Sequence, residues 1–508
     1  MKYTPDVIAA PFKTPPFLHQ IKEYEGHFGS AIRAKGWTMR TGKSKSVIDK
    51  ACFLHTVGGE RGKIDGVLVF APNGVHANWV VRELPAHMWD GVPYTSLVWH
   101  STRMGTIAAV KQDRGNWTDD QVAFWQALKD MRVEGRLVWF TVNTESMTRK
   151  DVRKAVARFF KTRKRVFVVF DESDDFGTPG AIRTKMGRSM RNHAAYVEIL
   201  SGTIITGSPL AAFSQFDLLK KGALGFNTFA EFKRHFAIEE ERSARGRTFS
   251  KVVGFQNEDE LRDRMAQYMS VVTREDVAGM PDLVQEPDID IEPTKEQLRI
   301  YRELHKSFRI AIRDEEISVG ERAVRLQKMQ QVFSGFVKDE SGETIIIPGR
   351  NPRVEALSRE VFLTPGKVIV WCQYQQDFVF LRKRLLADRV KFVEYHGRVP
   401  ERMKAKSLRL FREKRDFQVF LGHPQSCGRG IDLSAAQRII NYSHTFSARL
   451  IAQALERATK IGAKNIQLVD FMAPGPDFYI RSVTRARKEI ADAIAGVGMR
   501  DLLERLAL

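Results

Sequence analysis

Short apolar runs that end in polar or turn-forming residues limit the possible folds of this chain more than any other feature. The first half of the sequence contains four of them, at residues 66–72, 137–142, 166–170 and 203–205. A continuous apolar run of this length is typical of a strand that is buried on both faces of a parallel sheet. Because helical patterns separate the runs, they predict a doubly wound α/β sheet, in which ligands bind beyond the carboxyl ends of the strands.

The second half of the chain repeats this pattern at residues 367–372, 393–397, 418–422, 437–441 and 466–471. With 508 residues, the chain also exceeds the size that one hydrophobic core supports. We therefore expect an α/β protein with two doubly wound parallel-sheet lobes. The expected parts are an N-terminal lobe over 1–283, a linker and helical segment over 284–352, and a C-terminal lobe with a helical tail over 353–508. Within the first lobe we expect a helical insertion at about 213–275, with an exposed charged loop at 239–247.

The segment 39–44 has the sequence of the second half of a phosphate-binding loop, Met-Arg-Thr-Gly-Lys-Ser, and it opens a predicted helix. Backbone N–H groups at the helix start would face phosphate oxygens. Lys43 would reach the β- and γ-phosphates, and the Ser44 hydroxyl would hold Mg²⁺. A full loop has another glycine at the position of Trp37, so the hexapeptide alone fits an ordinary helix N-terminus equally well.

Two carboxylates directly after the third apolar run supply what such a loop lacks for nucleotide hydrolysis. Asp171 would position Mg²⁺, and Glu172 would polarise the attacking water. Upstream of the loop, the amide of Gln20 offers a donor and an acceptor together, which suits an adenine edge. On its own, Gln20 also fits a surface glutamine, and the acidic pair alone fits a turn at a strand end.

In the second half, a segment that runs from Gln453 to Gly462 follows the glycine-rich segment 428–433. If the segment is helical, Gln453, Arg457 and Lys460 lie on one face, at spacings of four and three residues. We expect this face to close over a nucleotide held by the first lobe and to supply the cation that stabilises the transferring phosphoryl group. The alternative is an amphipathic surface helix.

The charge of the chain indicates a polyanionic partner. Its formal net charge is +20 and its pI is near 9.8, which favours nucleic acid over a neutral small molecule. A charge that serves only solubility is the alternative. The basic run at 149–165 fits either a solvated helix face or a surface that follows phosphates.

Cysteine content and hydropathy indicate an intracellular protein. The three cysteines, Cys52, Cys372 and Cys427, lie far apart without paired spacing, so we expect reduced thiols rather than disulfides or a zinc site. No apolar run reaches membrane-spanning length, and the first residues lack a signal-peptide core. We therefore expect a cytoplasmic protein without a membrane partner, which includes the case of a phage protein in the host cytoplasm.

In this order and spacing, the segments resemble the superfamily 2 helicases and translocases, and specifically the SNF2-type branch with its small phage-encoded members. The resemblance extends from His19 through Gly462. It matches the adenine-reading segment at 19–20, motif I at 40–44, motif Ia at 71–83, the next motif at 143–146, motif II at 171–174, motif III at 206–209, motif V at 426–433 and motif VI at 453–460.

The resemblance implies two RecA-like lobes, with ATP and Mg²⁺ as cofactors. It assigns catalytic roles to Lys43, Asp171, Glu172, Gln453, Arg457 and Lys460, and metal contacts to Ser44 and Asp171. It assigns nucleotide contacts to Gln20, Arg40, Thr41, Gly42, Lys43, Ser44, Lys45, Gly430 and Asp432.

The function that the resemblance implies is ATP-driven translocation on nucleic acid. We expect a monomer whose ATP hydrolysis is stimulated by single-stranded, duplex or branched DNA and drives translocation, remodelling or branch migration. Two alternatives stay open: an RNA-dependent helicase, and a non-hydrolysing DNA-binding or recruitment module that retains the fold.

Four positions depart from the pattern of the family. Arg40 replaces a common glycine, and Asp174 replaces the usual histidine. Glu456 replaces a frequent glycine or acid, and Lys460 stands where the second arginine usually lies. Lysine keeps the charge but loses the planar fork of arginine. A negative φ at Arg40, with its side chain away from the phosphates, would make the loop a simple variant. An arginine that blocks the phosphate cradle would argue against an ATPase.

Overall fold

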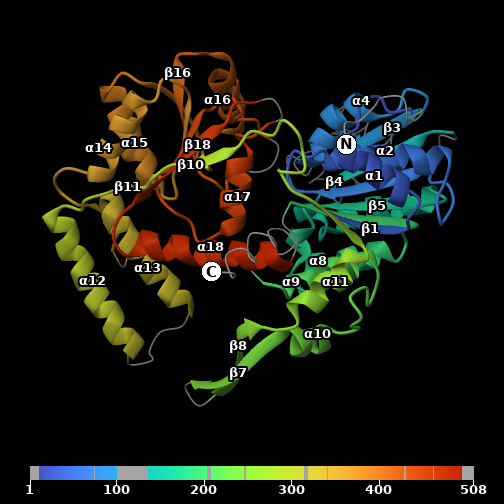
Figure 1. Ribbon diagram of the computed structural model, residues 1–508, viewed down its shortest axis with the longest axis horizontal. Coiled ribbons are helices and arrows are strands. Elements are labelled where there is room, and N and C mark those ends of the chain that lie inside the picture. Colours follow the sequence, from blue (N-terminus) through green and yellow to red (C-terminus); the bar gives the residue numbers. More distant parts are fainter. Residues whose placement is uncertain are drawn as a thin grey trace, which may run out of the picture. The chain divides into compact units, whose positions relative to one another are not determined.

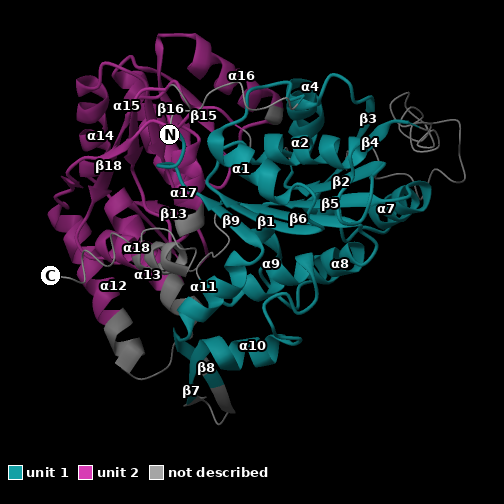
Figure 2. Ribbon diagram, turned by 45° about the vertical axis from the view of Figure 1, so that its right-hand side comes forward, with its two compact units in different colours: residues 1–277, 488–508 teal, residues 278–487 magenta. Residues whose placement is uncertain are grey.

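The computed structural model describes residues 11–73, 75–99, 135–202, 208–244, 247–313, 319–339, 341–427, 431–460 and 463–494 (Figure 1). These residues form two compact units, one that runs to Val277 and one from Ala278 to Arg487 (Figure 2). This division falls between Val277 and Ala278, and the domain boundaries expected at 283 and 352 stay predictions.

The first unit is built on a seven-stranded, all-parallel sheet with the order β3-β4-β2-β5-β6-β1-β9. Its strands are β1 (Ile32–Trp37), β2 (Gly66–Ala71), β3 (Tyr94–Val98), β4 (Leu137–Asn143), β5 (Val166–Asp171), β6 (Tyr196–Ser201) and β9 (Met269–Val272). The runs expected at 66–72, 137–142 and 166–170 are β2, β4 and β5, and these three strands are confirmed. The run expected at 203–205 lies outside the described residues, and the strand present in this region is β6.

Two central strands, β1 and β6, were not predicted from apolar runs, because each contains a charged residue. β1 contains Lys35 and β6 contains Glu198, and both side chains are fully buried. Their ion pair, with Nζ to Oε2 at 2.6 Å, lets each strand lie in the sheet interior. A pattern based on apolar runs alone misses such strands, because the compensating charge comes from a distant part of the sequence.

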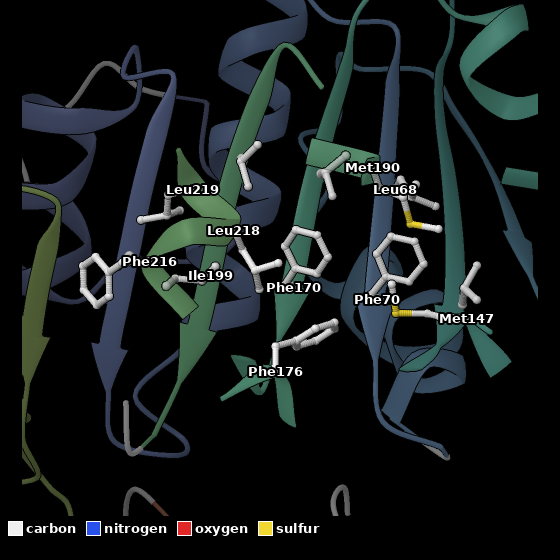
Figure 3. Packing of buried hydrophobic residues seen from close by; sticks show 14 of the residues in the cluster. Leu68, Phe70, Met147, Phe170, Phe176, Met190, Ile199, Phe216, Leu218 and Leu219 are labelled. Carbon is white, nitrogen blue, oxygen red and sulfur yellow. The ribbon is translucent and has the colours of Figure 1, made fainter. Parts of the chain in front are cut away.

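Helices cover both faces of this sheet. Along β2, Val67 and Val69 pack with α2 (Lys43–Thr56) and α4 (Leu84–His87), whereas Leu68 and Phe70 pack on the opposite face. The opposite face is covered by α7 (Lys150–Thr162), α8 (Ile182–Arg191), α9 (Ala211–Leu219) and α11 (Glu258–Ala266). Figure 3 shows Phe70 and Phe170 of the sheet beside Met190 of α8 and Leu218 of α9. Alternation between two buried faces explains why the strands read as continuous apolar runs.

The insertion after α9 contains an antiparallel hairpin, so the expectation of a helical insertion with an exposed loop is wrong at this point. After α10 (Phe229–Phe236), β7 (Ala237–Ala244) pairs with β8 (Arg247–Phe255) as a separate two-stranded sheet (Figure 1). The Thr, Phe and Val residues of β8 favour a strand. Strand β8 is the pairing partner that allows the charged stretch 239–241 to form the strand β7.

The second unit has a parallel sheet with the order β10-β18-β17-β14-β16-β15, and β11 also pairs with β18. Its strands are β10 (Leu283–Gln285), β11 (Ile289–Asp290), β14 (Val368–Trp371), β15 (Lys391–Tyr395), β16 (Phe417–Gly422), β17 (Arg438–Asn441) and β18 (Ile466–Met472). All five strands expected in this half are confirmed. The reading of 284–293 as a plain linker is wrong, because β10 and β11 add to the sheet beside β18.

Helices again pack on both faces. Val368 and Val370 of β14 pack with α14 (Pro352–Leu363) and α15 (Gln375–Ala387), whereas Ile369 and Trp371 pack with α16 (Glu401–Glu413) and α17 (Ala448–Glu456). The other helices are α12 (Lys295–Arg313), α13 (Val319–Ser334) and α18 (Pro476–Ile494), and β12 (Phe336–Lys338) pairs with β13 (Thr344–Ile346). The predicted fold class, α/β with two doubly wound parallel sheets, is confirmed.

All three cysteines are buried free thiols. Within the described parts of the chain, no helix combines the length and the apolar character that crossing a bilayer requires.

Candidate nucleotide site

The predicted phosphate loop lies between β1 and α2, at the carboxyl end of the sheet. Gly42 caps α2 with φ 86° and ψ 33°, and Arg40 has φ 64°. Both residues therefore adopt the left-handed region that glycine tolerates best. The negative φ considered for Arg40 is excluded, and its positive φ explains why the family commonly has glycine at this position. The arginine side chain is half-buried.

Helix α1 (Leu18–His27) supports the loop through two side chains. A ring nitrogen of His19 lies 2.8 Å from the Thr41 carbonyl oxygen, and the Gln20 amide donates to the Gly42 carbonyl at 2.9 Å. Gln20 also accepts from the backbone N–H of Phe17 at 2.9 Å. A Cβ on Gly42 would lie 2.3 Å from the Gln20 amide nitrogen, so only glycine fits there. Gln20 is therefore buried and stabilises the loop through these hydrogen bonds. Its contact with adenine stays a prediction.

The ammonium group of Lys43 lies against its own loop. It donates to the Trp37 carbonyl oxygen at 2.6 Å and lies 3.4 Å from that of Thr38. Thr41 closes the loop with a hydroxyl hydrogen bond to the Thr38 carbonyl at 2.7 Å. A phosphate group would offer this ammonium charged acceptors in place of backbone carbonyls, and charge-assisted hydrogen bonds are about twice as strong as neutral ones.

Lys45 lies on the flank of α2. Its ammonium pairs with Asp49 one turn later, at 2.5 Å, and lies 4.9 Å from the centre of the Phe12 ring. The Asp49 carboxylate also accepts from the Trp89 indole at 2.9 Å. These contacts tie α2 to its neighbours, and a contact of Lys45 with nucleotide stays a prediction.

Asp171 ends β5 and is held by a residue of the motif Ia segment. The indole N–H of Trp79 donates to its Oδ2 at 3.0 Å, and Asp171 is buried. Trp79 begins a π-helical turn, Trp79–Glu83, a feature frequent at functional sites. Burial and then the nearby Asp171 carboxylate raise the pKa of Glu83 above its usual range. The resemblance placed Trp79 in a motif but gave it no role, and its indole orients the predicted metal ligand.

Glu172 follows in a left-handed conformation, with φ 55° and ψ 58°, and is buried. The next residue, Ser173, donates its hydroxyl to Gln215 of α9 at 2.8 Å. This contact anchors the turn after β5 to the helix layer below it. Asp174, which stands in place of the usual histidine, is also buried.

The strand order brings the loop and the carboxylates to one edge. In the order β5-β6-β1, one strand separates the two, so they are about 10 Å apart. The end of β6 lies against the loop, because a Cβ on Gly202 would be 3.6 Å from the Met39 side chain. Ser44 and Asp171 offer the oxygen donors that Mg²⁺ prefers. The residues present therefore fit a nucleoside triphosphate with Mg²⁺, although the first half of motif III, 206–207, lies outside the described residues.

In the second unit, segments of motifs V and VI meet. The Arg457 carbonyl accepts from the Leu433 N–H at 2.9 Å, and Lys460 Nζ lies 3.8 Å from Asp432 Oδ2. The predicted single helical face is wrong for Lys460, because α17 ends at Glu456 and Arg457 is its C-cap. Gln453 lies within α17 and is half-buried, and Gly430 lies outside the described residues. Arg457 is buried and Lys460 is exposed, so the two cations have different surroundings.

The chain is similar in sequence to several known proteins. A family model described as helicase conserved C-terminal domain matches residues 352–462. The chromatin-remodeling ATPase INO80 of Cryptococcus neoformans is 25% identical over 154 residues, which cover 30% of this chain and 9% of that protein. DNA excision repair protein ERCC-6 of Mus musculus is 24% identical over 318 residues, which cover 59% of this chain and 21% of that protein. The chain thus spans less than a quarter of the length of either relative.

Among solved structures, the Sulfolobus solfataricus SWI2/SNF2 ATPase core in complex with dsDNA aligns over 96% of this chain and 95% of that chain. The identity is 16% and the TM-score is 0.40.

The phosphate loop and the carboxylates thus share one edge of the first doubly wound sheet, and the helicase match falls in the second unit. The chain is similar to the helicases and translocases of superfamily 2, and in particular to their SNF2-like branch.

Proposed function

We propose that this protein is a DNA-dependent ATPase that uses ATP hydrolysis for translocation on DNA, with remodelling or branch migration as the outcome. The observation that carries the proposal is the pairing, on one sheet edge, of a phosphate loop with a buried Asp171 that is oriented by the Trp79 indole. Relatives whose names refer to chromatin remodelling and DNA excision repair support DNA as the nucleic acid.

The roles of the residues follow from their chemistry. Lys43 would leave the Trp37 carbonyl for the β- and γ-phosphates, and the loop N–H groups would hold the remaining oxygens. Bound Mg²⁺ would neutralise charge on the phosphates, held by Ser44 and Asp171. Glu172 would polarise the attacking water. Arg457 and Lys460 would stabilise the charge that develops on the transferring group.

ATP turnover measured with and without DNA tests the proposal. We expect DNA to raise turnover, and Lys43→Ala and Glu172→Gln each to lower it by about 100-fold or more. Lys460→Ala should lower turnover more than it weakens nucleotide binding, because its effect belongs to the transition state. Lys22→Ala, at an exposed position of α1, is the control and should change nothing.

Three outcomes would contradict the proposal. Turnover that ignores DNA, or that survives in both the Lys43 and the Glu172 variant, excludes a DNA-dependent ATPase of this kind. Stronger stimulation by RNA of the same sequence points to the RNA helicase alternative. Nucleotide binding without phosphate release points to the non-hydrolysing module.

A further inference from the structure

The edge of the first sheet where the strands begin carries a concentration of basic residues that the nucleotide site does not use. All strands of this sheet are parallel, so their starts lie together on the edge opposite to the phosphate loop. A six-residue strand separates the two edges by about 20 Å. The basic run of 149–165 ends at this strand-start edge, directly before β5.

Two cavities open on the strand-start edge. The first has a volume of about 390 Å³ and is lined by Ala157, Phe160, Lys161, Arg163, Lys164, Val166 and His193. The second has a volume of about 410 Å³, and its lining includes Arg61, Arg191, Asn192, Ala194, Lys220 and Lys221. His193 and Ala194 are adjacent in the chain, so the two cavities are neighbours. Together the two linings hold seven lysines and arginines but a single carboxylate, that of Glu60.

Arg163 is the strongest indication of a ligand. Its residue exposure is 9%, and its Nε has no hydrogen-bond partner within the described part of the chain. Burial lowers the pKa of Arg163, and only Asp65 acts against this effect. The Asp65 carboxylate already accepts from the backbone N–H groups of Lys164 and Arg165, at 2.9 Å each. A buried guanidinium nitrogen without a hydrogen-bond partner is unfavourable, and a bound anion would offset the penalty.

Helix ends explain part of this charge but not all of it. Lys161 and Arg191 lie in the last turns of α7 and α8, where a cation gains about 0.3–1 kcal/mol from the helix dipole. Arg163 is buried after the end of α7, and Lys220 and Lys221 follow the end of α9 as exposed side chains. No ion pair within the described residues engages Lys161, Lys164, Lys220 or Lys221.

The first cavity combines cations with aromatic rings. The rings of Phe160 and His193 lie 5.8 Å apart at an angle of 53°, and Lys161, Arg163 and Lys164 surround them. Lysines and arginines that neutralise phosphates supply most of the sequence-independent affinity of a protein for duplex DNA.

We propose that the strand-start edge of the first sheet is a second nucleic-acid site, which binds the phosphates of a DNA segment other than the one that stimulates ATP hydrolysis. The inference rests on the proposed function, because it takes DNA as the partner. One chain would then hold two DNA segments, one engaged by the motor and one held on the opposite edge of the first sheet.

Native mass spectrometry of the full chain with short DNA duplexes tests this by counting the duplexes bound per chain. We expect two duplexes on the wild type and one on the double variant Lys161→Glu/Lys164→Glu, with DNA-stimulated turnover unchanged within about twofold. In titrations against salt, the milder double variant Lys161→Ala/Lys164→Ala should weaken the second binding event and lower its log–log slope by about 1.8, or about 0.9 for each phosphate that the variant no longer neutralises. Lys22→Glu/Lys185→Glu makes the same charge change as Lys161→Glu/Lys164→Glu at exposed positions of α1 and α8 and should keep both duplexes.

Arg163→Met separates a binding role from a structural one. If the buried cation serves the ligand, this variant should lose the second duplex and melt a few degrees higher than the wild type in the absence of DNA. A lower melting temperature with both duplexes retained would overturn the inference.

Three further results would also overturn it. One duplex per wild-type chain, with normal stimulation of turnover, removes the second site and leaves the proposed function standing. Two duplexes on the Lys161/Lys164 double variant place the second DNA elsewhere. Tighter binding of polyglutamate than of a duplex with the same charge shows that the partner is an acidic protein. Turnover that DNA does not stimulate in the wild type contradicts the proposed function instead.

Discussion

At the scale of single residues, backbone strain is concentrated in the nucleotide site. Four non-glycine residues of the described chain have positive φ: Arg40, Glu172, Asn257 and Arg389. The first two lie in the phosphate loop and in the turn that carries the predicted catalytic carboxylate. Each such residue costs about 1–3 kcal/mol and persists only where the surrounding structure holds it. The hydrogen bonds of His19 and Gln20 to the loop supply that support.

Arg40→Gly tests whether the loop needs the backbone conformation or the arginine itself. Glycine adopts φ 64° without strain, so we expect the free energy of unfolding to rise by about 1 kcal/mol and the melting temperature to rise with it. ATP turnover should stay within about threefold. Arg389→Gly, at φ 57° on the exposed end of α15, is the matched control and should stabilise without any change in turnover. A stabilised but inactive Arg40→Gly would mean that the guanidinium acts on the nucleotide.

Trp79→Phe tests the orientation of Asp171. The substitution keeps the ring but removes the N–H that donates to Oδ2, and loss of such a support typically costs about 10- to 100-fold in metal affinity or activity. We expect the Mg²⁺ concentration for half-maximal turnover to rise accordingly. Trp139→Phe is the control, because its ring lies 6.4 Å from that of Trp79 and its buried indole N–H has no partner among the described residues. An unchanged Mg²⁺ dependence in Trp79→Phe would contradict the assigned role.

At the scale of elements, a buried charge cluster joins the phosphate-loop helix to the sheet. Glu198 of β6 accepts a hydrogen bond from Lys35 of β1 at 2.6 Å and forms an ion pair with Lys50 of α2 at 2.8 Å, and all three side chains are almost completely buried. Burial alone would raise the pKa of Glu198, but the two ammonium groups outweigh it and hold that pKa below the usual range. The cluster fixes α2, and therefore Lys43 and Ser44 at its start, against the two central strands.

Glu198→Gln should destabilise the first unit strongly. The variant removes the carboxylate with which both ammonium groups pair, and breaking a buried pair in this way costs about 3–5 kcal/mol. Urea unfolding, followed by circular dichroism, measures the loss. Glu25→Gln, at an exposed position of α1, is the control and should stay within about 0.5 kcal/mol. A small loss in Glu198→Gln would mean that the lysines are neutral in the folded state.

The start of α15 gives the second unit a pH dependence. Asp377 is fully buried and accepts from the Tyr374 N–H at 3.1 Å and the Ser443 hydroxyl at 2.8 Å. Burial raises its pKa to about 6. The folded unit therefore holds a proton that the unfolded chain, with a carboxyl pKa of about 3.9, has already released. The stabilisation is present below about pH 4 and is lost as the pH rises through 6.

Urea unfolding at pH 5 and pH 7 checks this direction. From the two pKa values, we expect a total contribution on the order of 3 kcal/mol, part of which disappears between pH 5 and pH 7. Asp377→Asn should reduce this part of the pH dependence. Asp388→Asn, at the other end of α15, should leave it in place, because the pKa of Asp388 is lowered and its carboxylate is ionised throughout this range. An equal dependence in the wild type and Asp377→Asn would contradict the assignment.

Elements with continuous apolar runs could be predicted from the sequence, and elements that depend on distant partners could not. β2, β5 and β14 carry their burial in their own residues. β1 and β6 need the Lys35–Glu198 pair, and β10 and β11 need β18 as a partner. In the site, the loop and the carboxylates were accessible as motifs. Three other features depend on three-dimensional contacts and could not be predicted. They are the hydrogen bond of Gln20 to the loop, that of the Trp79 indole to Asp171, and the end of α17 before Lys460.

At the scale of the whole molecule, the chain combines two similar sheets with an unequal distribution of chemistry. The phosphate loop and the carboxylate pair both belong to the first unit, whereas the second contributes the Arg457 and Lys460 segment and the helicase match. The formal charge of +20 is spread over both halves of the sequence, and part of it collects on the strand-start edge of the first sheet.

The pairing of β10 with β18 has a consequence for synthesis on the ribosome. The sheet of the first unit is complete once β9 has emerged at Val272, so it can form while the rest of the chain is still being made. In the second unit, Leu283 pairs with Ile466, so the earliest strand of that sheet waits for one of the last. Domains generally fold as units as they emerge from the N-terminus. This chain therefore gains its phosphate loop early, and its second sheet closes only after β18 has been translated.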